Sequence, residues 1–306
     1  MKVSDVRIYR NALTVGTLAF VCGLGAGLLP VTAHASTNNL FGQGRPLGTG
    51  VVSNITGAAG TGIVPWALIS GYGNSHQIGF TASYGNLTTP ETSLNTYSVA
   101  AGIFNRVEVS VGQQSFNMAP TTLFTQDIVG LKVRVLGNIL KSESPWLPQI
   151  AVGMNYHHSE NTTLVKLSGA QNGSGETYYI AATKLWGHGL FGHTTLLDFT
   201  LNGTKANLNG LVGFGGPTNP GYKVEPEVSG AVFLDPHVVV GGDWREMPNN
   251  AGTLAATAYS SRAWKDAFVA YLPNKSLSLV LGYAMLGKVA GTPNQNSLYT
   301  SMTVSF

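Results

Sequence analysis

The last ten residues, 297–306, alternate strictly between two kinds of side chain. One face of an extended strand would carry Leu298, Thr300, Met302, Val304 and Phe306, and the other Ser297, Tyr299, Ser301, Thr303 and Ser305. A period of two, with one face mainly apolar and the other polar, predicts a strand between an apolar medium and a wet one. An edge strand of a soluble β-sandwich would show the same period, so this segment alone leaves both open.

Segments of the same character fill the rest of the chain and are separated by turn-forming residues. They cover residues 47–56, 63–72, 76–84, 97–104, 107–112, 127–136, 149–157, 177–186, 194–202, 222–234, 237–245, 264–272, 276–286 and 297–306. In residues 127–136, Val129 and Leu131 alternate with Gly130 and Lys132, which shows the period clearly.

The connections between these segments alternate in length. The short ones are residues 73–75, 105–106, 235–236 and 273–275, and the long ones are 113–126, 158–176, 203–221 and 246–263. Short turns on one side and long loops on the other are typical of outer-membrane barrels. Residues 203–221 are assigned to an outer loop, because a strand at 208–214 would reverse the alternation for everything after it.

We therefore predict an all-β, closed antiparallel transmembrane β-barrel formed by residues 47–306. It has about fourteen strands if residues 47–56 form the first, and twelve or sixteen remain open. An even number places both ends in the periplasm and requires the last strand to pair with the first. Phe306, at the end of that last strand, resembles the sorting signal that barrel-assembly machinery reads.

The N-terminus has the pattern of a secretory leader. Lys2, Arg7 and Arg10 precede an apolar segment and Ala33-His34-Ala35, which predicts a signal peptide over residues 1–35 and export by the general secretory pathway. An uncleaved anchor helix is the alternative, weakened by several glycines and Pro30. Residues 36–46 are then a periplasmic segment. The single cysteine, Cys22, lies in the leader, so the mature chain can form no disulfide or thiolate site.

Charge composition excludes one class of partner and favours another. The chain has 17 basic and 14 acidic residues, and removal of the leader takes away three basic residues and one acidic residue. The near-neutral remainder argues against nucleic acid, which needs a basic field. Charged residues make up only 10% of the chain, which suits a barrel embedded in membrane. We expect outer-membrane lipids and lipopolysaccharide, the assembly machinery and a small solute as partners, and the Gram-negative outer membrane as the location.

Several stretches carry a resemblance to a known family. They are Gly57-Ala-Ala-Gly-Thr-Gly-Ile-Val-Pro-Trp-Ala-Leu-Ile69, Asp127-Ile-Val-Gly-Leu-Lys-Val-Arg134, Leu147-Pro-Gln-Ile-Ala-Val-Gly153, Ala182-Thr-Lys-Leu185, Thr204-Lys-Ala-Asn-Leu-Asn-Gly-Leu-Val-Gly-Phe-Gly-Gly216, Pro248-Asn-Asn250 and Ala270-Tyr-Leu-Pro-Asn-Lys275. With these the chain resembles a proteobacterial family of outer-membrane-type proteins of unknown function, DUF3034. The resemblance implies a barrel over nearly the whole mature chain and supplies no activity.

One candidate catalytic pair lies in His157-His158-Ser159-Glu160, at the outer end of a strand. Outer-membrane lipases and lipid A deacylases look similar there, with a histidine two residues before a serine. Base and hydroxyl must share a face, as His157 and Ser159 do. That face continues the one that carries Gln149 and Asn155, which we interpret as lumenal, whereas those enzymes present their pair to lipid. A polar strand end without catalysis is therefore the favoured interpretation.

Inward-facing charges suggest a second kind of site. The candidate lumen-lining residues are Lys132, Arg134, Asp198, Glu225, Glu227, Asp243 and Arg245. Charges inside a barrel select solutes by sign. Their mixed signs indicate either a polar lumen without strong ion preference or ion pairs across a narrow, filled lumen.

Metal and cofactor sites have little support. His188, His193 and His237 lie near predicted periplasmic turns, but Gly187–His193 has no partnering carboxylate. The glycine-rich residues 57–62 lack the strand–helix setting and lysine of a phosphate loop, and suit an outer turn or a hinge into the lumen.

We expect no cofactor and no enzyme activity. Passage of a small solute is the leading hypothesis, with a lipid hydrolase and a structural or assembly barrel as alternatives.

Overall fold

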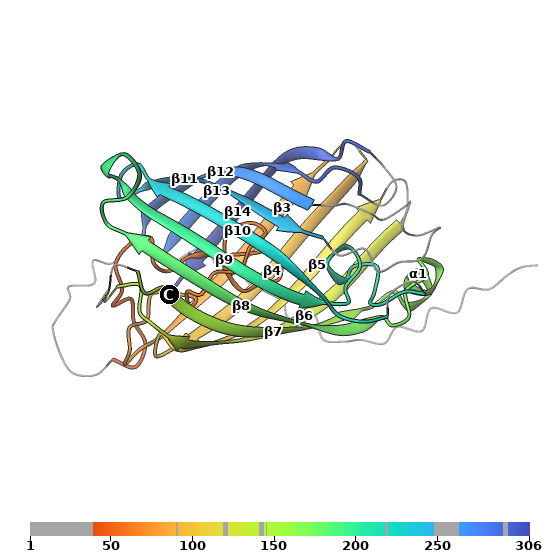
Figure 1. The fold of residues 1–306 in the computed structure, drawn as a ribbon, viewed down its shortest axis with the longest axis horizontal. Coiled ribbons are helices and arrows are strands. Elements are labelled where there is room, and N and C mark those ends of the chain that lie inside the picture. The colour runs from red at the N-terminus through yellow and green to blue at the C-terminus, as the bar shows by residue number, and fades with distance from the viewer. Residues whose placement is uncertain are drawn as a thin grey trace, which may run out of the picture. The chain divides into compact units, whose positions relative to one another are not determined.

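The computed structural model describes residues 39–89, 91–118, 122–140, 144, 146–217, 220–247, 263–289 and 293–306, and their architecture is all-β. Twelve antiparallel strands close into a barrel (Figure 1). They are β3 (Ile78–Thr88), β4 (Thr92–Ile103), β5 (Val107–Met118), β6 (Thr122–Leu136), β7 (Gln149–Ser159), β8 (Ser174–Trp186), β9 (Thr194–Thr204), β10 (Lys223–Phe233), β11 (Val238–Glu246), β12 (Ala263–Asn274), β13 (Leu277–Met285) and β14 (Asn296–Ser305).

The barrel closes between its last strand and β3. Pairing of β14 with β3 runs from Tyr299 opposite Leu87 to Ser305 opposite Thr81. The expected pairing of residues 297–306 with residues 47–56 is therefore wrong, and so is the count of fourteen. Twelve strands, which the sequence had left open, close the barrel.

Side chains alternate across the wall with opposite character on the two sides. Val109, Val111 and Ile180 point outward and are 42–54% exposed, whereas Glu108 and Lys132 point inward and are buried. A barrel with an apolar exterior and a polar interior is the arrangement that lipid around the wall requires. No helix in the described part of the chain is long and apolar enough to cross a membrane.

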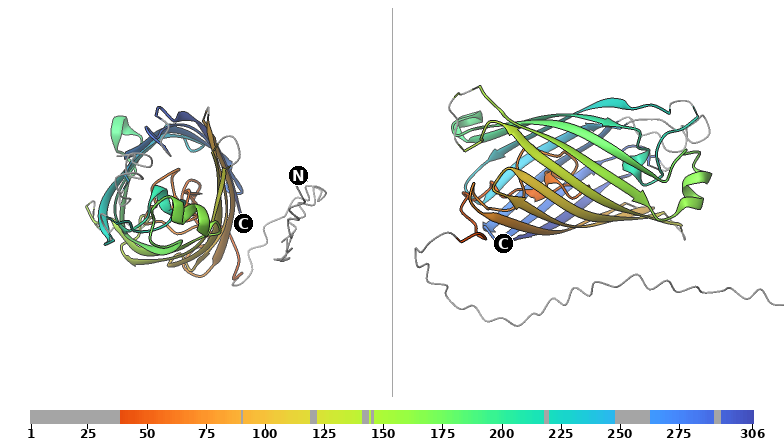
Figure 2. Two further views of the ribbon diagram at one scale, coloured as in Figure 1. Left: turned by 90° about the vertical axis from the view of Figure 1, so that its right-hand side faces the viewer. Right: turned by 90° about the horizontal axis from the view of Figure 1, so that it is seen from below.

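Residues 45–72, called the plug below, lie inside the barrel. Figure 2 shows this segment, coloured red to orange, within the ring of strands. It contains the two-residue strands β1 (Val52–Ser53) and β2 (Ala59–Gly60), which pair with each other. The predicted strands at residues 47–56 and 63–72 both belong to the plug, and the wall begins at Ile78 rather than at residue 47. Their apolar side chains are buried against the inner wall instead of facing lipid.

The two barrel ends differ. One, the turn end, carries the turn between β4 and β5 and also Phe306, which exchanges backbone hydrogen bonds with Phe80. The predicted periplasmic segment covers residues 36–46, and its described residues, from 39 onward, lie at the turn end. Gln43 in this segment contacts Ser276 and Ser305. The predicted leader, residues 1–35 with Cys22, and residues 248–250 lie outside the described residues.

The other end, the loop end, carries α1 (Thr162–Leu167) between β7 and β8, and η2 (Leu208–Gly210) between β9 and β10. A third short helical segment, η1 (Leu190–Gly192), lies at the turn end. Residues 208–214 form a loop rather than a strand, as predicted, although this loop turns into the barrel. The predicted long loop at residues 113–126 is wrong, because β5 and β6 continue through it to Met118 and from Thr122.

Candidate functional site

An ion pair on neighbouring strands fixes the middle of the plug. Lys132 Nζ lies 3.2 Å from Glu108 Oε1, and both side chains are buried. The same ammonium donates to the carbonyl oxygens of Ala59 and Leu68, each at 2.9 Å. The Glu108 carboxylate accepts from the backbone N–H of Ala59 at 3.0 Å and of Ser70 at 2.8 Å. Both charges are therefore neutralised by each other and by plug backbone.

A second ion pair joins the plug to the loop that carries η2, which turns into the barrel from the loop end. Arg245 Nε lies 3.1 Å from Glu227 Oε1. Its Nη1 donates to the carbonyl of Ile63 at 3.1 Å, and its Nη2 donates to Asn209 Oδ1 at 3.0 Å. Asp243 accepts from the backbone N–H of Ile63 at 3.4 Å. One guanidinium thus connects the wall, the plug and the loop that carries η2.

Arg45 fixes the plug at the turn end. Its Nη1 donates to Asn105 Oδ1 at 2.8 Å, and its Nη2 donates to the carbonyls of Ile69, at 2.6 Å, and Gly71. Burial lowers the pKa of Arg45 to about 10, so the group still carries its charge at neutral pH. Arg45 is not predictable from the sequence, because nothing in residues 36–46 indicates that this segment enters a lumen.

Uncharged groups extend this contact along one side of the barrel. Thr183 Oγ1 accepts from the backbone N–H of Ala67, Gln149 Nε2 donates to its carbonyl, and Thr200 Oγ1 donates to the carbonyl of Pro65. We call the inward surface of β5 to β11 the polar wall. It binds the plug through side-chain hydrogen bonds to plug backbone, whose polar groups would otherwise be buried without partners.

All seven predicted lumen-lining residues lie on inward faces. Lys132, Asp243 and Arg245 bind the plug directly, and Glu227 pairs with Arg245. Asp198 is buried and accepts hydrogen bonds from Thr183 and Thr200. Arg134 and Glu225 alternate in phase with Lys132 and Glu227 and are only partly buried. The filled lumen with internal ion pairs, one of the two alternatives, is what the described residues form.

The opposite side of the lumen is mainly apolar. Its apolar inward residues are Trp264, Phe268, Ala270 and Leu272 on β12, Val280 and Ala284 on β13, and Leu286 just beyond it, all 2–7% exposed. Two polar residues, Asp266 on β12 and Ser278 on β13, are buried on the same inward faces. We call this surface the apolar wall. The apolar wall is not predictable from the sequence, because the outward residues of the same strands, such as Val269 and Tyr271, are apolar too. Period-two patterning cannot assign faces when both are apolar.

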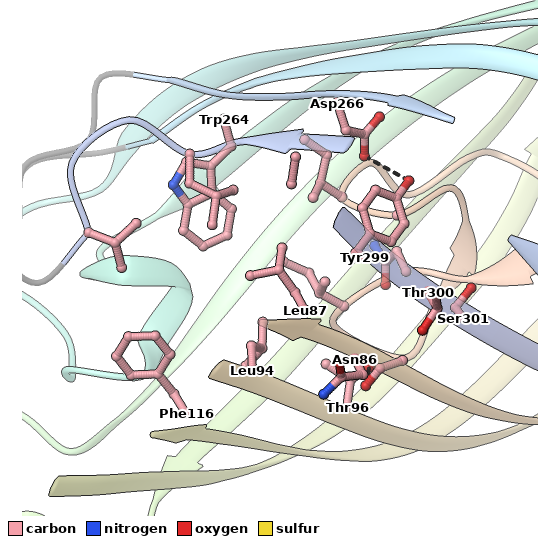
Figure 3. Close-up of a pocket in the computed structure, with 18 of the residues that line it drawn as sticks. Asn86, Leu87, Leu94, Thr96, Phe116, Trp264, Asp266, Tyr299, Thr300 and Ser301 are labelled. Atoms are coloured by element: carbon pink, nitrogen blue, oxygen red, sulfur yellow. Dashed lines mark hydrogen bonds between the residues drawn. The ribbon is translucent and has the colours of Figure 1, made fainter. Parts of the chain in front are cut away.

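Three cavities lie between the plug and the walls, at successive depths. The first, of about 70 Å³, lies toward the loop end and is lined by Leu94, Phe116 and Trp264 (Figure 3). The second, of about 50 Å³, lies between the plug and Phe268 and Val280. The third, of about 460 Å³, opens at the turn end. All three are lined mainly by apolar side chains.

The cavities adjoin one another. Gly62 lines both the first and the second, and Gly48 and Phe233 line both the second and the third. Beside Gly62, Tyr299 Oη donates to Asp266 Oδ2 at 3.1 Å, as the dashed line in Figure 3 marks. The three neighbouring cavities, which lie in succession along the plug, are together called the seam below.

The predicted His157–Ser159 pair lies on the lumenal face, and both residues are buried. His157 Nδ1 lies 3.3 Å from Gln126 Oε1, and its ring packs 5.6 Å from that of Phe214. The three turn-end histidines do not form a metal site: among the described residues, no group of three or more His, Cys, Asp or Glu side chains could hold an ion.

Fold and site together define a plugged antiparallel β-barrel of the outer-membrane type, with an apolar exterior and a two-sided lumen. The chain belongs to the DUF3034 family, described as protein of unknown function, whose profile matches residues 49–303. No curated protein is similar enough to match the chain.

Solved structures with a similar fold include porins and a lipid-degrading enzyme. The NanC porin shares 11% identity over 75% of this chain and 98% of its own, with a TM-score of 0.42. The KdgM porin shares 8% over 74% and 99%, with a TM-score of 0.44. Outer membrane phospholipase A from Escherichia coli shares 9% over 77% and 94%, with a TM-score of 0.39. Values this low say nothing about the activity of this chain.

Proposed function

We propose that this protein lies in the Gram-negative outer membrane and conducts a small, uncharged, mainly apolar solute along the seam while the plug stays in place. The observation that carries the proposal is the succession of mainly apolar cavities along the plug. Neighbouring cavities share Gly62 at one junction and Gly48 and Phe233 at the other, so a solute that passes these two junctions would meet mainly apolar side chains.

The charge arrangement favours an uncharged solute. Two buried inward cations are paired, Lys132 with Glu108 and Arg245 with Glu227. Asp266, which lines the first cavity, accepts a hydrogen bond from Tyr299. A charged solute would enter a narrow, mainly apolar space where desolvation is costly. An ion-conducting pore would need charged or polar groups facing the path, whereas the polar wall directs such groups to the plug.

The dimensions limit the size of the solute. Cavities of about 70 and 50 Å³ are smaller than the roughly 150 Å³ cavity that takes up benzene. Passage therefore requires side chains of the apolar wall to move aside. Rotamer changes of this kind are fast compared with movement of a plug held by two buried ion pairs.

Uptake and conductance measured together test this function. Intact cells with and without the protein are compared for uptake of a labelled small aromatic alcohol, and purified protein in planar bilayers is tested for ion conductance. We expect protein-dependent uptake with conductance close to that of the bare bilayer. Uptake that does not depend on the protein, or a large steady ion conductance, would contradict the proposal.

A further inference from the structure

A row of polar side chains crosses four neighbouring strands on the lipid-facing side, near the loop end. Gln113 on β5 lies opposite Asp127 on β6, Asp127 lies opposite His158 on β7, and His158 lies opposite Ser174 on β8. Asp127 and His158 are exposed, while their neighbours Gln126 and His157 are buried in the lumen. This row is one residue out of phase with the predicted pair, and a shift of one residue moves a side chain to the other face.

Two hydrogen bonds join neighbours in the row in pairs. His158 Nδ1 lies 2.8 Å from Ser174 Oγ, and Gln113 Nε2 donates to Asp127 Oδ1 at 3.0 Å. A histidine within hydrogen-bond reach of a serine hydroxyl is the basic unit of nucleophilic acyl transfer. A carboxylate beside the histidine supplies the third, orienting group. Asp127 lies directly opposite His158 in the pairing of β6 with β7. The other nearby carboxylate, Glu176, lies two residues after Ser174 and accepts a hydrogen bond from Tyr222 Oη at 3.5 Å.

The row lies close to outward tyrosines of the same strands, which mark the membrane interface. Tyr156 and Tyr178 point outward on the same two strands and are 40% and 48% exposed. Outward tyrosines mark the headgroup level of a barrel. His158 follows Tyr156 by two residues, which is about 6.6 Å along a strand, so it lies just beyond that level.

We propose that Ser174 and His158 form a lipid-facing nucleophile and base that hydrolyse an ester bond of a membrane lipid, with Asp127 as a positioning residue for His158. Ser174 Oγ bonds to the acyl carbonyl carbon while His158 takes the hydroxyl proton. The lipid alcohol leaves with that proton, which gives an acyl-serine. Water, deprotonated by His158, then attacks the acyl carbon, the fatty acid is released, and the proton returns to Ser174.

Fatty-acid release from phospholipid in mixed detergent micelles tests the dyad on the full-length protein. We expect Ser174→Ala and His158→Asn to lower the rate at least about 100-fold, and a fluorophosphonate probe to label Ser174. The matched control is Ser159→Ala, which removes a lumenal hydroxyl from the neighbouring strand and should leave the rate unchanged. Heat-dependent mobility on gels reports that each variant is folded.

Three outcomes would overturn the dyad: a folded wild-type protein that releases no fatty acid, a Ser174→Ala variant as active as wild type, or labelling elsewhere. For Asp127, the readout is the effect of conservative replacement on kcat and KM. Asp127→Asn should lower kcat with little change in KM, and Asp127→Glu, which restores a carboxylate, should recover most of the rate. An unchanged kcat in Asp127→Asn, or the same loss with Glu176→Gln instead, would remove Asp127 from the site. Because the row lies outside the barrel, these results are independent of the seam.

Discussion

Lys132 and Glu108 face each other from neighbouring strands at 3.2 Å, and each also binds the backbone of the plug. The pair therefore makes contacts that belong to both the wall and the plug. Charges that line a barrel are usually interpreted as attracting or repelling solutes. In this lumen, the most buried pair is structural, because both of its members also bind plug backbone.

Replacing Lys132 should release the plug from the polar wall. Lys132→Met leaves the Glu108 carboxylate buried without its partner, which typically costs about 3–5 kcal/mol. We expect a lower unfolding temperature, easier proteolysis of residues 45–72, and measurable ion conductance. Lys184→Met is the matched control, because Lys184 donates instead to the carbonyls of Ser144 and Leu147 outside the lumen. Equal behaviour of the two variants would show that the pair does not hold the plug.

A side chain at Gly62 should close the seam. A Cβ there would lie 2.8 Å from Tyr299 Oη and 2.9 Å from Asp266 Oδ2, at the junction of two cavities. We expect Gly62→Val to cost about 1–3 kcal/mol through overpacking and to reduce solute uptake to background. Gly203→Val adds the same side chain on β9, where the nearest atom to a new Cβ is 3.7 Å away, and should leave uptake unchanged. Normal uptake by folded Gly62→Val would exclude this path.

Shortening Phe268 should widen the seam. Its ring lines the second cavity from the apolar wall and is 7% exposed. Phe268→Ala should lower stability by about 3–5 kcal/mol and raise the uptake of solutes too bulky for the wild type. Val269→Ala, on the lipid face of the same strand, is the control and should leave the size limit unaltered. A size limit that is the same in all three proteins would place the restriction elsewhere.

Arg45 should not be replaceable by lysine. The guanidinium reaches Asn105, Ile69 and Gly71 at once through two nitrogen atoms, and an ammonium on a flexible stem cannot reproduce that fork. We expect Arg45→Lys to leave a buried acceptor unsatisfied at about 1–3 kcal/mol. Faster amide exchange at residues 69–72, with exchange in β12 unchanged, is the measurement. Wild-type exchange in Arg45→Lys would show that charge alone suffices.

The barrel class was predictable because most strands differ in character between their two faces. A period of two alone assigns Val129 and Lys132 to opposite faces, and they are 51% and 0% exposed. The loop at residues 208–214 was assigned correctly from the alternation of connection lengths. The strand count was not predictable in the same way, since residues 63–69, Ile-Val-Pro-Trp-Ala-Leu-Ile, are as apolar as a membrane strand. An apolar segment satisfies the same pattern whether it packs on lipid or on an apolar lumen.

The candidate sites could not be predicted from the residue pattern of any single strand, because each is formed by residues of several chain segments. The seam needs the inward faces of β12 and β13 and the plug together, and both faces of those strands are apolar. The His158–Ser174 contact joins residues 16 positions apart, and only the register of β7 with β8 brings them into contact. The sequence emphasised His157 and Ser159 because they are close in the chain, and the fold places both in the lumen.

Locking the plug to the wall with a disulfide and measuring uptake tests passage along the seam. Ser83 Oγ on the wall lies 2.9 Å from Ser53 Oγ on the plug, so Ser53→Cys with Ser83→Cys should form a disulfide under oxidising conditions. If the solute follows the seam with the plug in place, uptake of the aromatic alcohol should be the same in the oxidised and reduced protein. A disulfide that fails to form would contradict the position of the plug, and uptake that stops on oxidation and returns on reduction would contradict passage along the seam.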